Sequence, residues 1–148
     1  MKLETERLLL REITQADYTA LSAILQDPEV MYAYNGPFSD AETQEWLDRQ
    51  LARYRDYEHR FGLWAVVLKE TGEMIGQCGI TLQPWKERQV LEIGYLLRKS
   101  CWHQGYATEA ALACKAYAFT VLDANEVCSP SSPPATRTIA LRSTPITA

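Results

Sequence analysis

The fold is decided by two neighbouring stretches, Leu91-Glu92-Ile93-Gly94-Tyr95-Leu96-Leu97 and Gly105-Tyr106-Ala107-Thr108-Glu109-Ala110. The first is rich in branched and aromatic residues, which is typical of a strand. The second opens an alanine-rich segment with an apolar stripe of helical period. A strand, a glycine turn and a helix predict an anion site, because the first N–H groups of a helix lack partners and its dipole favours negative charge. An ordinary capped helix remains the alternative for so short a motif.

Working outward, further strands and helices surround this unit. Capping boxes at 14–17 and 39–42 predict two helices, the second reaching about Tyr57. Strand patterns occur at 3–12, 61–68, 74–82 and 90–97, and a polar loop with Pro84 is expected at 83–88. The arrangement predicts an α/β (α+β) domain built on an antiparallel meander.

Composition excludes several classes of function. The chain has 148 residues and a formal net charge of -4, with acidic and basic residues mixed, so a nucleic-acid partner is not expected. The amino terminus is charged, and no apolar run approaches the roughly 20 residues of a membrane span, so we expect a cytoplasmic protein with no membrane partner. The cysteines (Cys78, Cys101, Cys114, Cys128) form no C-x-x-C pair, which predicts reduced thiols and no metal site.

The two deciding stretches resemble the core signature of the GNAT (Gcn5-related) N-acetyltransferases, particularly the branch that includes the ribosomal-protein N-terminal acetyltransferases. Thr5-Glu6-Arg7-Leu8-Leu9-Leu10-Arg11 is similar to the first strand of that branch, and Gly76-Gln77-Cys78-Gly79-Ile80 to its paired central strand. The resemblance covers residues 1–128. It implies a mixed, mostly antiparallel sheet flanked by helices, with two neighbouring strands splaying apart.

The resemblance also implies acetyl-CoA as co-substrate. Backbone groups of the key strand would pair with the pantetheine amides, namely those of Ile93, Gly94, Tyr95, Leu96 and Leu97. N–H groups of the turn would hold the pyrophosphate, namely those of Gln104, Gly105, Tyr106, Ala107 and Thr108. Trp102 stands where family members most often have glutamine or arginine, a mild departure because the cradle uses backbone donors.

The implied reaction is acetyl transfer to a primary amine of a protein amino terminus or a small molecule. Glu92 is the one carboxylate on the key strand and is the candidate general base, with a structural carboxylate as the alternative. Tyr95 and Tyr106 could donate a proton by chemical type, but packing roles are favoured for both. His103 is interpreted as a solvated turn residue.

The last twenty residues, 129–148, depart from the composition of the domain. They hold no acidic residue, glycine or aromatic, and twelve are serine, threonine or proline, so we expect an irregular tail. Our hypothesis is that a reading-frame change or truncation replaced the native carboxyl end, leaving the GNAT-like domain without its last elements and its activity impaired. An exposed sheet edge would favour a homodimer. The alternative function is a non-catalytic acyl-CoA-binding or assembly module.

Overall fold

The computed structural model describes residues 3–34, 36–85, 88–124, 126–128 and 141–142. The described strands form one seven-stranded sheet in the order of the chain, β1 (Leu3–Glu4), β2 (Leu8–Glu12), β3 (Leu63–Leu68), β4 (Met74–Trp85), β5 (Arg88–Leu97), β6 (Glu126–Cys128) and β7 (Leu141–Arg142). All pairs are antiparallel except β5 with β6. The mixed, mostly antiparallel sheet expected from the sequence is confirmed.

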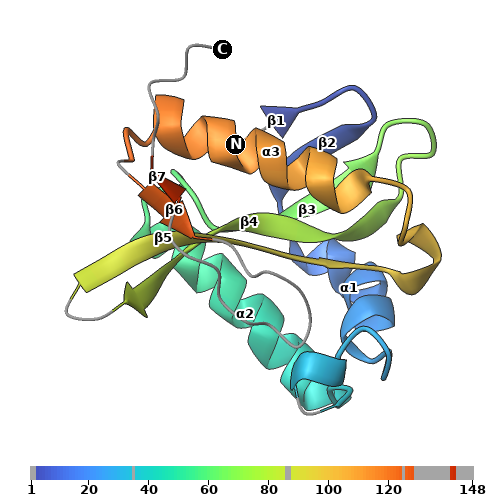
Figure 1. Cartoon of the computed structure of the whole chain (residues 1–148). Coiled ribbons are helices and arrows are strands. Elements are labelled where there is room, and N and C mark those ends of the chain that lie inside the picture. The colour runs from blue at the N-terminus through green and yellow to red at the C-terminus, as the bar shows by residue number, and fades with distance from the viewer. Residues whose placement is uncertain (1–2, 35, 86–87, 125, 129–140, 143–148) are drawn as a thin grey trace.

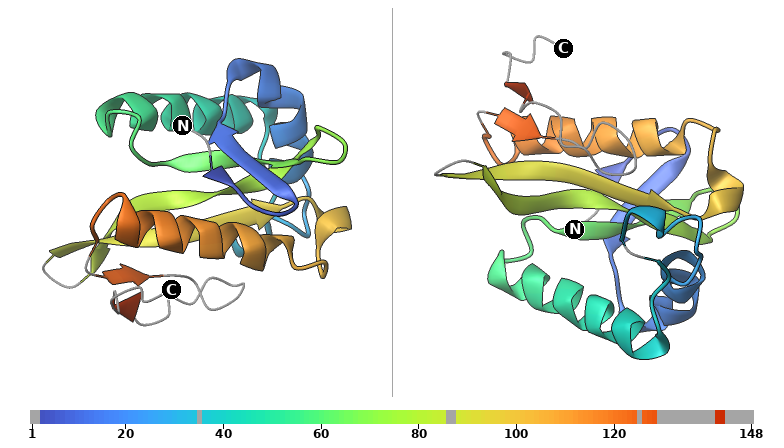
Figure 2. Two further views of the ribbon diagram at one scale, coloured as in Figure 1. Left: turned by 90° about the horizontal axis from the view of Figure 1, so that it is seen from above. Right: turned by 60° about the horizontal axis from the view of Figure 1, so that its bottom comes forward.

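Helices cover both faces of the sheet (Figures 1 and 2). Helix α3 (Tyr106–Thr120) lies on one face, whereas α1 (Tyr18–Leu25) and α2 (Asp40–Asp56) lie on the other. Short 3-10 turns complete the described elements, at Gln15–Asp17 (η1), Tyr32–Tyr34 (η2) and Lys99–Cys101 (η3). The sheet is therefore the middle of three layers, each interface of which buries apolar side chains.

The two capping boxes form as the sequence predicts. Glu42 accepts the N–H of Ser39 at 2.9 Å and Ser39 Oγ accepts the N–H of Glu42 at 3.1 Å, which fixes the start of α2. Asp17 accepts the N–H of Thr14 at 2.8 Å, but the segment it opens begins as the 3-10 turn η1 before α1 continues.

The prediction of a polar loop at 83–88 is wrong, because the paired strands of the β4–β5 hairpin occupy most of this stretch. Gln83 pairs with Val90 and Pro84 with Gln89. Pro84 is tolerated because the alternation of the ladder turns its nitrogen away from β5. The nitrogen faces the side of β4 where β3 has already ended, at the Leu63–Gly79 pair, so no ladder hydrogen bond is lost there.

Two clusters of buried side chains fill the layers. Leu8, Trp64, Ile80 and Cys114 belong to the cluster on the α3 side, and Leu21 and Leu47 to the cluster under α1 and α2. Cys78, Cys101 and Cys114 are free and buried, with 3.8 Å between the sulfurs of Cys78 and Cys114. The expectation of buried reduced thiols is confirmed for these three.

Strand β6 pairs with β5 at only two positions, Leu91 with Val127 and Glu92 with Cys128. Among the described residues no strand continues this pairing along β5 from Ile93 to Leu97. Among these residues the sheet therefore has an opening beside the carboxyl half of β5. The tail expected at 129–148 lies outside the described residues except for Leu141–Arg142, which form β7 instead of an irregular segment.

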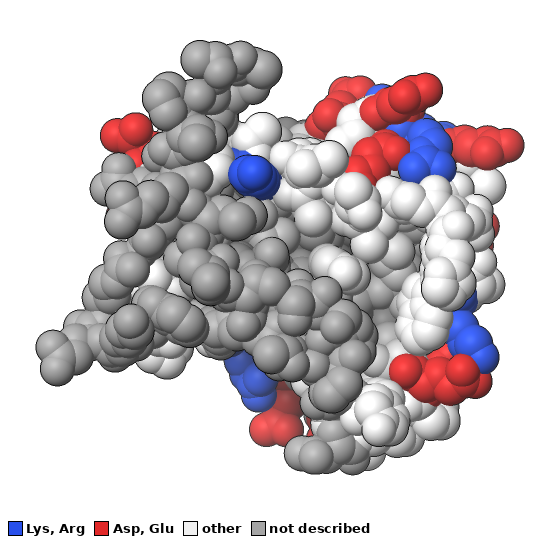
Figure 3. Space-filling model, viewed as in Figure 1, with Lys and Arg blue, Asp and Glu red and all other residues white. Residues whose placement is uncertain are grey.

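The surface of the described residues carries charges of both signs. On the face shown in Figure 3, acidic and basic side chains lie beside one another, and no large patch of one sign is seen among the residues that are coloured. In the described part of the chain, no helix combines the length and apolar character needed to cross a membrane.

Candidate functional site

The carboxyl half of β5 directs backbone polar groups into the opening of the sheet. The N–H of Arg98 donates to the carbonyl of Ile75 at 2.8 Å, continuing the β4–β5 ladder. Because hydrogen-bonded and non-hydrogen-bonded pairs alternate in an antiparallel ladder, Leu97, Tyr95 and Ile93 turn their N–H and C=O groups away from β4. The N–H of Leu97, both backbone groups of Tyr95 and the carbonyl of Ile93 thus face a ligand lying beside the strand.

Helix α3 begins beside this opening. Its N-cap Gly105 has φ 82° and ψ 3°, a left-handed conformation that suits glycine. The first N–H of the helix with an acceptor is that of Glu109, which donates to the carbonyl of Gly105 at 3.0 Å. In the described part of the structure no acceptor takes the N–H groups of Tyr106, Ala107 and Thr108. These donors and the positive end of the helix dipole make the start of α3 a candidate anion site.

A cavity of about 400 Å³ joins the strand to the turn. Tyr95, Leu96 and Leu97 line it from β5, and a second set lines it from α3 and its N-cap, consisting of Gly105, Tyr106, Ala107 and Thr108. The volume lies within the range of small-molecule sites, roughly 300–1,000 Å³. Seven of the residues predicted to bind a cofactor therefore meet around one cavity.

The remaining predicted residues lie outside that lining. Ile93, Gly94 and Gln104 do not line the cavity, and neither does Glu92. Ile93 is 4% exposed and packs into the cluster under α3, so its backbone alone faces the opening. Gly94 directs its backbone to β4, with which it pairs through Gly79. Not every residue from 93 to 97 can therefore offer backbone groups to a ligand; only the alternate residues Ile93, Tyr95 and Leu97 face the opening.

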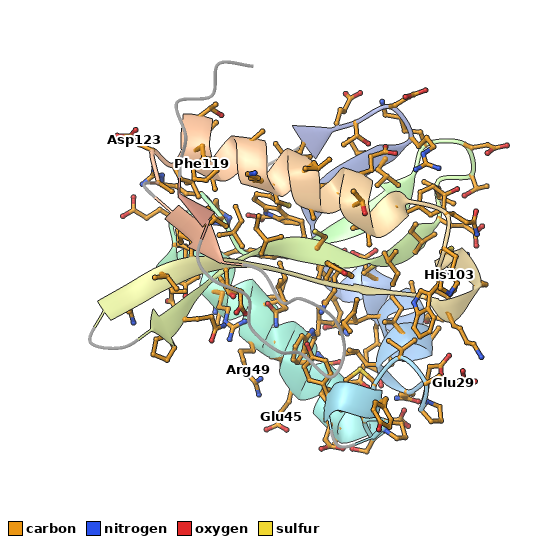
Figure 4. All side chains as sticks on the ribbon, viewed as in Figure 1. Glu29, Glu45, Arg49, His103, Phe119 and Asp123 are labelled. Carbon is orange, nitrogen blue, oxygen red and sulfur yellow. The ribbon has the colours of Figure 1, made fainter. Side chains whose placement is uncertain are left out.

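Trp102 ties the strand to the turn. Its indole N–H donates to the carbonyl of Leu97 at 2.9 Å, and its side chain lines the cavity. The neighbouring His103 has φ 62°, also left-handed, and is exposed. Figure 4 shows His103 at the η3 end of α3, with Phe119 and Asp123 at the opposite end. Trp102 therefore joins the end of β5 to the segment that precedes α3.

A wall of the cavity comes from a loop that the sequence did not single out. Val30 lines the cavity from the segment after α1. The adjacent Glu29 forms an ion pair with Lys99, which belongs to η3. This ion pair connects the loop to the turn that follows β5.

The start of α3 is fastened to the first hairpin of the chain. Glu109 accepts the Nε–H of Arg7 at 2.7 Å and the backbone N–H of Arg7 at 2.9 Å, and it also accepts the hydroxyl of Thr5. Partial burial acts to raise the pKa of Glu109, but the hydrogen bonds from Thr5 and Arg7 outweigh it and the pKa is lowered. Glu109 is therefore an ionised anchor.

Glu92 lies at the last pair before β5 and β6 separate. Its side chain lies on the same face of the sheet as those of its β4 partner Thr81 and of Gln77. This is the face covered by α2, because the side chain of Gln77 accepts the indole N–H of Trp46 from α2 at 3.1 Å. Burial, followed by the charge of Glu92, raises the pKa of Tyr34 in η2. Glu92 and Tyr34 thus interact electrostatically on the α2 side of the sheet.

Sequence reasoning missed Arg7, Val30 and Tyr34. The segment containing Arg7 was recognised only as strand, because nothing local reveals a partner 102 residues away. Tyr34 lies in the 3-10 turn η2, where the sequence has no recognisable motif. No group of three or more His, Cys, Asp or Glu that could hold a metal occurs in the described part of the chain.

Comparison with known proteins gives a family match across most of the chain. The model of the acetyltransferase (GNAT) domain matches residues 7–141, which extends past Cys128, where the resemblance was expected to end. An uncharacterised N-acetyltransferase of Bacillus licheniformis, p20, is 33% identical over 141 residues, covering 94% of this chain and 78% of the relative.

Solved structures agree in fold. The crystal structure of an acetyltransferase from Agrobacterium tumefaciens strain C58 has a TM-score of 0.75 and 34% identity, covering 90% of this chain and 75% of the other. The ribosomal L7/L12 alpha-N-protein acetyltransferase RimL in complex with coenzyme A has a TM-score of 0.68 and 16% identity, covering 87% and 73% of the two chains. At that identity the similarity to RimL concerns the fold.

Proposed function

The chain belongs to the GNAT family of N-acetyltransferases, and from this premise we propose that it transfers the acetyl group of acetyl-CoA to a primary amine of a protein amino terminus or a small molecule. The observation that carries the proposal is the single cavity bounded by the outward backbone of β5 and the free N–H groups of α3. Acetyl-CoA has the matching chemistry, with amides along its pantetheine arm and a pyrophosphate beyond them.

Each part of the co-substrate has a place in this arrangement. Backbone N–H groups of Gly105, Tyr106, Ala107 and Thr108 would hold the pyrophosphate without a cationic side chain. Backbone groups of Ile93 and Tyr95 would pair with the pantetheine amides, because they face the opening. The carbonyl of Leu97 is already used by Trp102. The arm would thus run along β5 from the turn toward Glu92, which places the thioester near the point where β5 and β6 separate.

Glu92 is the proposed general base. The amine nitrogen attacks the thioester carbonyl, a C–N bond forms, the C–S bond breaks, and CoA leaves as the thiolate, which takes a proton from solvent water. Glu92 would accept the proton that the amine loses, directly or through water, which contributes typically 10²–10⁴-fold to such a step. Tyr34, whose pKa is raised by burial and by the charge of Glu92, is a phenol near neutral pH, so its hydroxyl can donate a hydrogen bond to an acceptor bound there.

Thiol release from acetyl-CoA tests this function. Purified protein is incubated with acetyl-CoA and a panel of amino-terminal peptides, polyamines and aminoglycosides, and free CoA thiol is followed with a chromogenic disulfide. Amine-dependent release with at least one acceptor is expected. Tight binding of acetyl-CoA by calorimetry without release for any amine would favour a non-catalytic acyl-CoA-binding module. Absence of binding would refute the proposal.

The proposal includes a cytoplasmic location and a homodimer. Light scattering coupled to size-exclusion chromatography checks the homodimer, for which a mass near twice 16.8 kDa is expected.

A further inference from the structure

A cluster of four side chains surrounds the start of α3 on the side of the first hairpin. Arg7 is its centre, contacting Glu109 through Nε and stacking its guanidinium over the ring of Tyr106, 4.3 Å from the centroid. Arg7 Nη1 donates to the carbonyl of Gln104 at 3.0 Å. Thr5 completes the cluster through its hydrogen bond to Glu109. One guanidinium therefore holds the residues on both sides of Gly105.

Gly105 itself lies against the same group. A Cβ atom on Gly105 would be 3.3 Å from Arg7 Nη2, closer than an ordinary van der Waals contact. The glycine thus serves two purposes, since it adopts a left-handed conformation and leaves room for Arg7. The turn and the guanidinium are fitted to one another.

The ion pair between Arg7 and Glu109 affects anion binding at the start of α3, because Glu109 is negatively charged. Glu109 lies in the first turn of α3, where a carboxylate is favoured by the helix dipole but repels a second anion bound to the same N–H groups. Arg7 supplies a compensating positive charge at 2.7 Å, and the carboxylate, whose side chain is 19% exposed, is directed toward Thr5 and Arg7. The N-terminus of α3 therefore remains attractive to a bound pyrophosphate.

We propose that Arg7 is a positioning residue for acetyl-CoA, which fixes the backbone of Gln104, Gly105 and Tyr106 and neutralises Glu109 so that the α3 N–H groups receive the pyrophosphate. This inference rests on the proposed function. Arg7 does not line the cavity, so its effect passes through the turn. The recognised ligand group is the pyrophosphate, and the pantetheine end of the ligand lies beyond its influence.

The experiment compares CoA with pantetheine, which lacks the pyrophosphate together with the adenosine 3′-phosphate beyond it. The dissociation constants of CoA and of pantetheine are measured for the wild type and Arg7→Met, by calorimetry and by ligand-observed NMR respectively. We expect CoA binding to weaken about tenfold, on the scale of charge interactions at helix ends. Pantetheine binding should change less than twofold. Arg7→Lys keeps the charge but loses the planar fork, so CoA binding should weaken about threefold.

Lys69→Met is the matched control. Lys69 pairs with Glu4 at 2.9 Å in the same hairpin region, and this ion pair does not involve α3. The control should leave the affinities for both ligands unchanged. If Arg7→Met fails to fold, Arg7→Lys carries the comparison alone.

Distinct results overturn the proposal and the function beneath it. Equal weakening of CoA and pantetheine would show a general structural role for Arg7, and unchanged CoA affinity would show no role; either result overturns the positioning proposal while leaving acetyl-CoA binding intact. Failure of the wild type to bind CoA would overturn both.

Discussion

Gly105→Ala perturbs the turn at the one position where backbone conformation and ligand binding meet. The residue has φ 82°, and an alanine in this region costs about 1–2 kcal/mol. The added Cβ would stand 3.3 Å from Arg7 Nη2, a flexible end that can retreat, so the steric cost is small beside the conformational one. The melting temperature should fall by roughly 2–8 °C.

Gly72→Ala is the control that separates an effect on stability from an effect on ligand binding. Gly72 has φ 76° in the β3–β4 turn, and a Cβ there would meet nothing within 4 Å. Its conformational cost should equal that of Gly105→Ala, so the two variants should melt at similar temperatures.

Calorimetric titration with acetyl-CoA then shows whether the turn at Gly105 contributes to binding. Gly105→Ala should weaken binding about tenfold, because displacement of Arg7 and of the turn removes oriented N–H donors worth about 1–2 kcal/mol. Gly72→Ala should bind as the wild type does. Equal affinities for both variants, or wild-type affinity for Gly105→Ala, would refute the assignment of the pyrophosphate to this turn.

Three further predictions concern other parts of the molecule. Glu92→Gln should lower kcat at least 10²-fold while changing the dissociation constant of acetyl-CoA less than twofold; steady-state kinetics with calorimetry checks this, and unchanged kcat would exclude Glu92 as the base. Burial acts to raise the pKa of Asp17, but hydrogen bonds, chiefly from Arg11 at 2.8 Å and 2.9 Å, outweigh it and lower that pKa. Because the pKa of Asp17 is lower in the native state than in the unfolded chain, its stabilisation is complete above about pH 4 and is lost as the pH falls through the native pKa. The free energy of unfolding, measured in urea over this pH range, should therefore depend less on pH in Arg11→Met than in the wild type. Trp102→Phe leaves the carbonyl of Leu97 without its 2.9 Å donor and should reduce the free energy of unfolding by about 1 kcal/mol in urea, whereas no loss would mean that water replaces the indole.

Local patterns predicted the elements that hold the site. The stretch from Leu91 to Leu97 is strand, and Tyr106 begins a helix after Gly105, because residue type, period and turn chemistry agree there. The far end of the same helix was less well predicted. Val121 continues the apolar period of this segment in the sequence, yet it follows the last helical residue and is 53% exposed.

Features that depend on distant partners could not be predicted from local patterns. Pro84 reads as a loop residue, and only the early end of β3 explains why β4 continues through it. The partnership of Arg7 with Glu109 joins residues 102 positions apart, and no periodicity encodes it. The alternation that selects Ile93 and Tyr95 over Gly94 depends on the β4–β5 register, which likewise is set by tertiary pairing.

A crystal structure of the protein with acetyl-CoA is the most direct test of the central claim. The pyrophosphate oxygens are expected within about 2.7–3.2 Å of the backbone nitrogens of the turn from Gly105 to Thr108, with the pantetheine amides on Ile93 and Tyr95. Acetyl-CoA bound elsewhere, or bound with its pyrophosphate on side chains away from α3, would contradict the account.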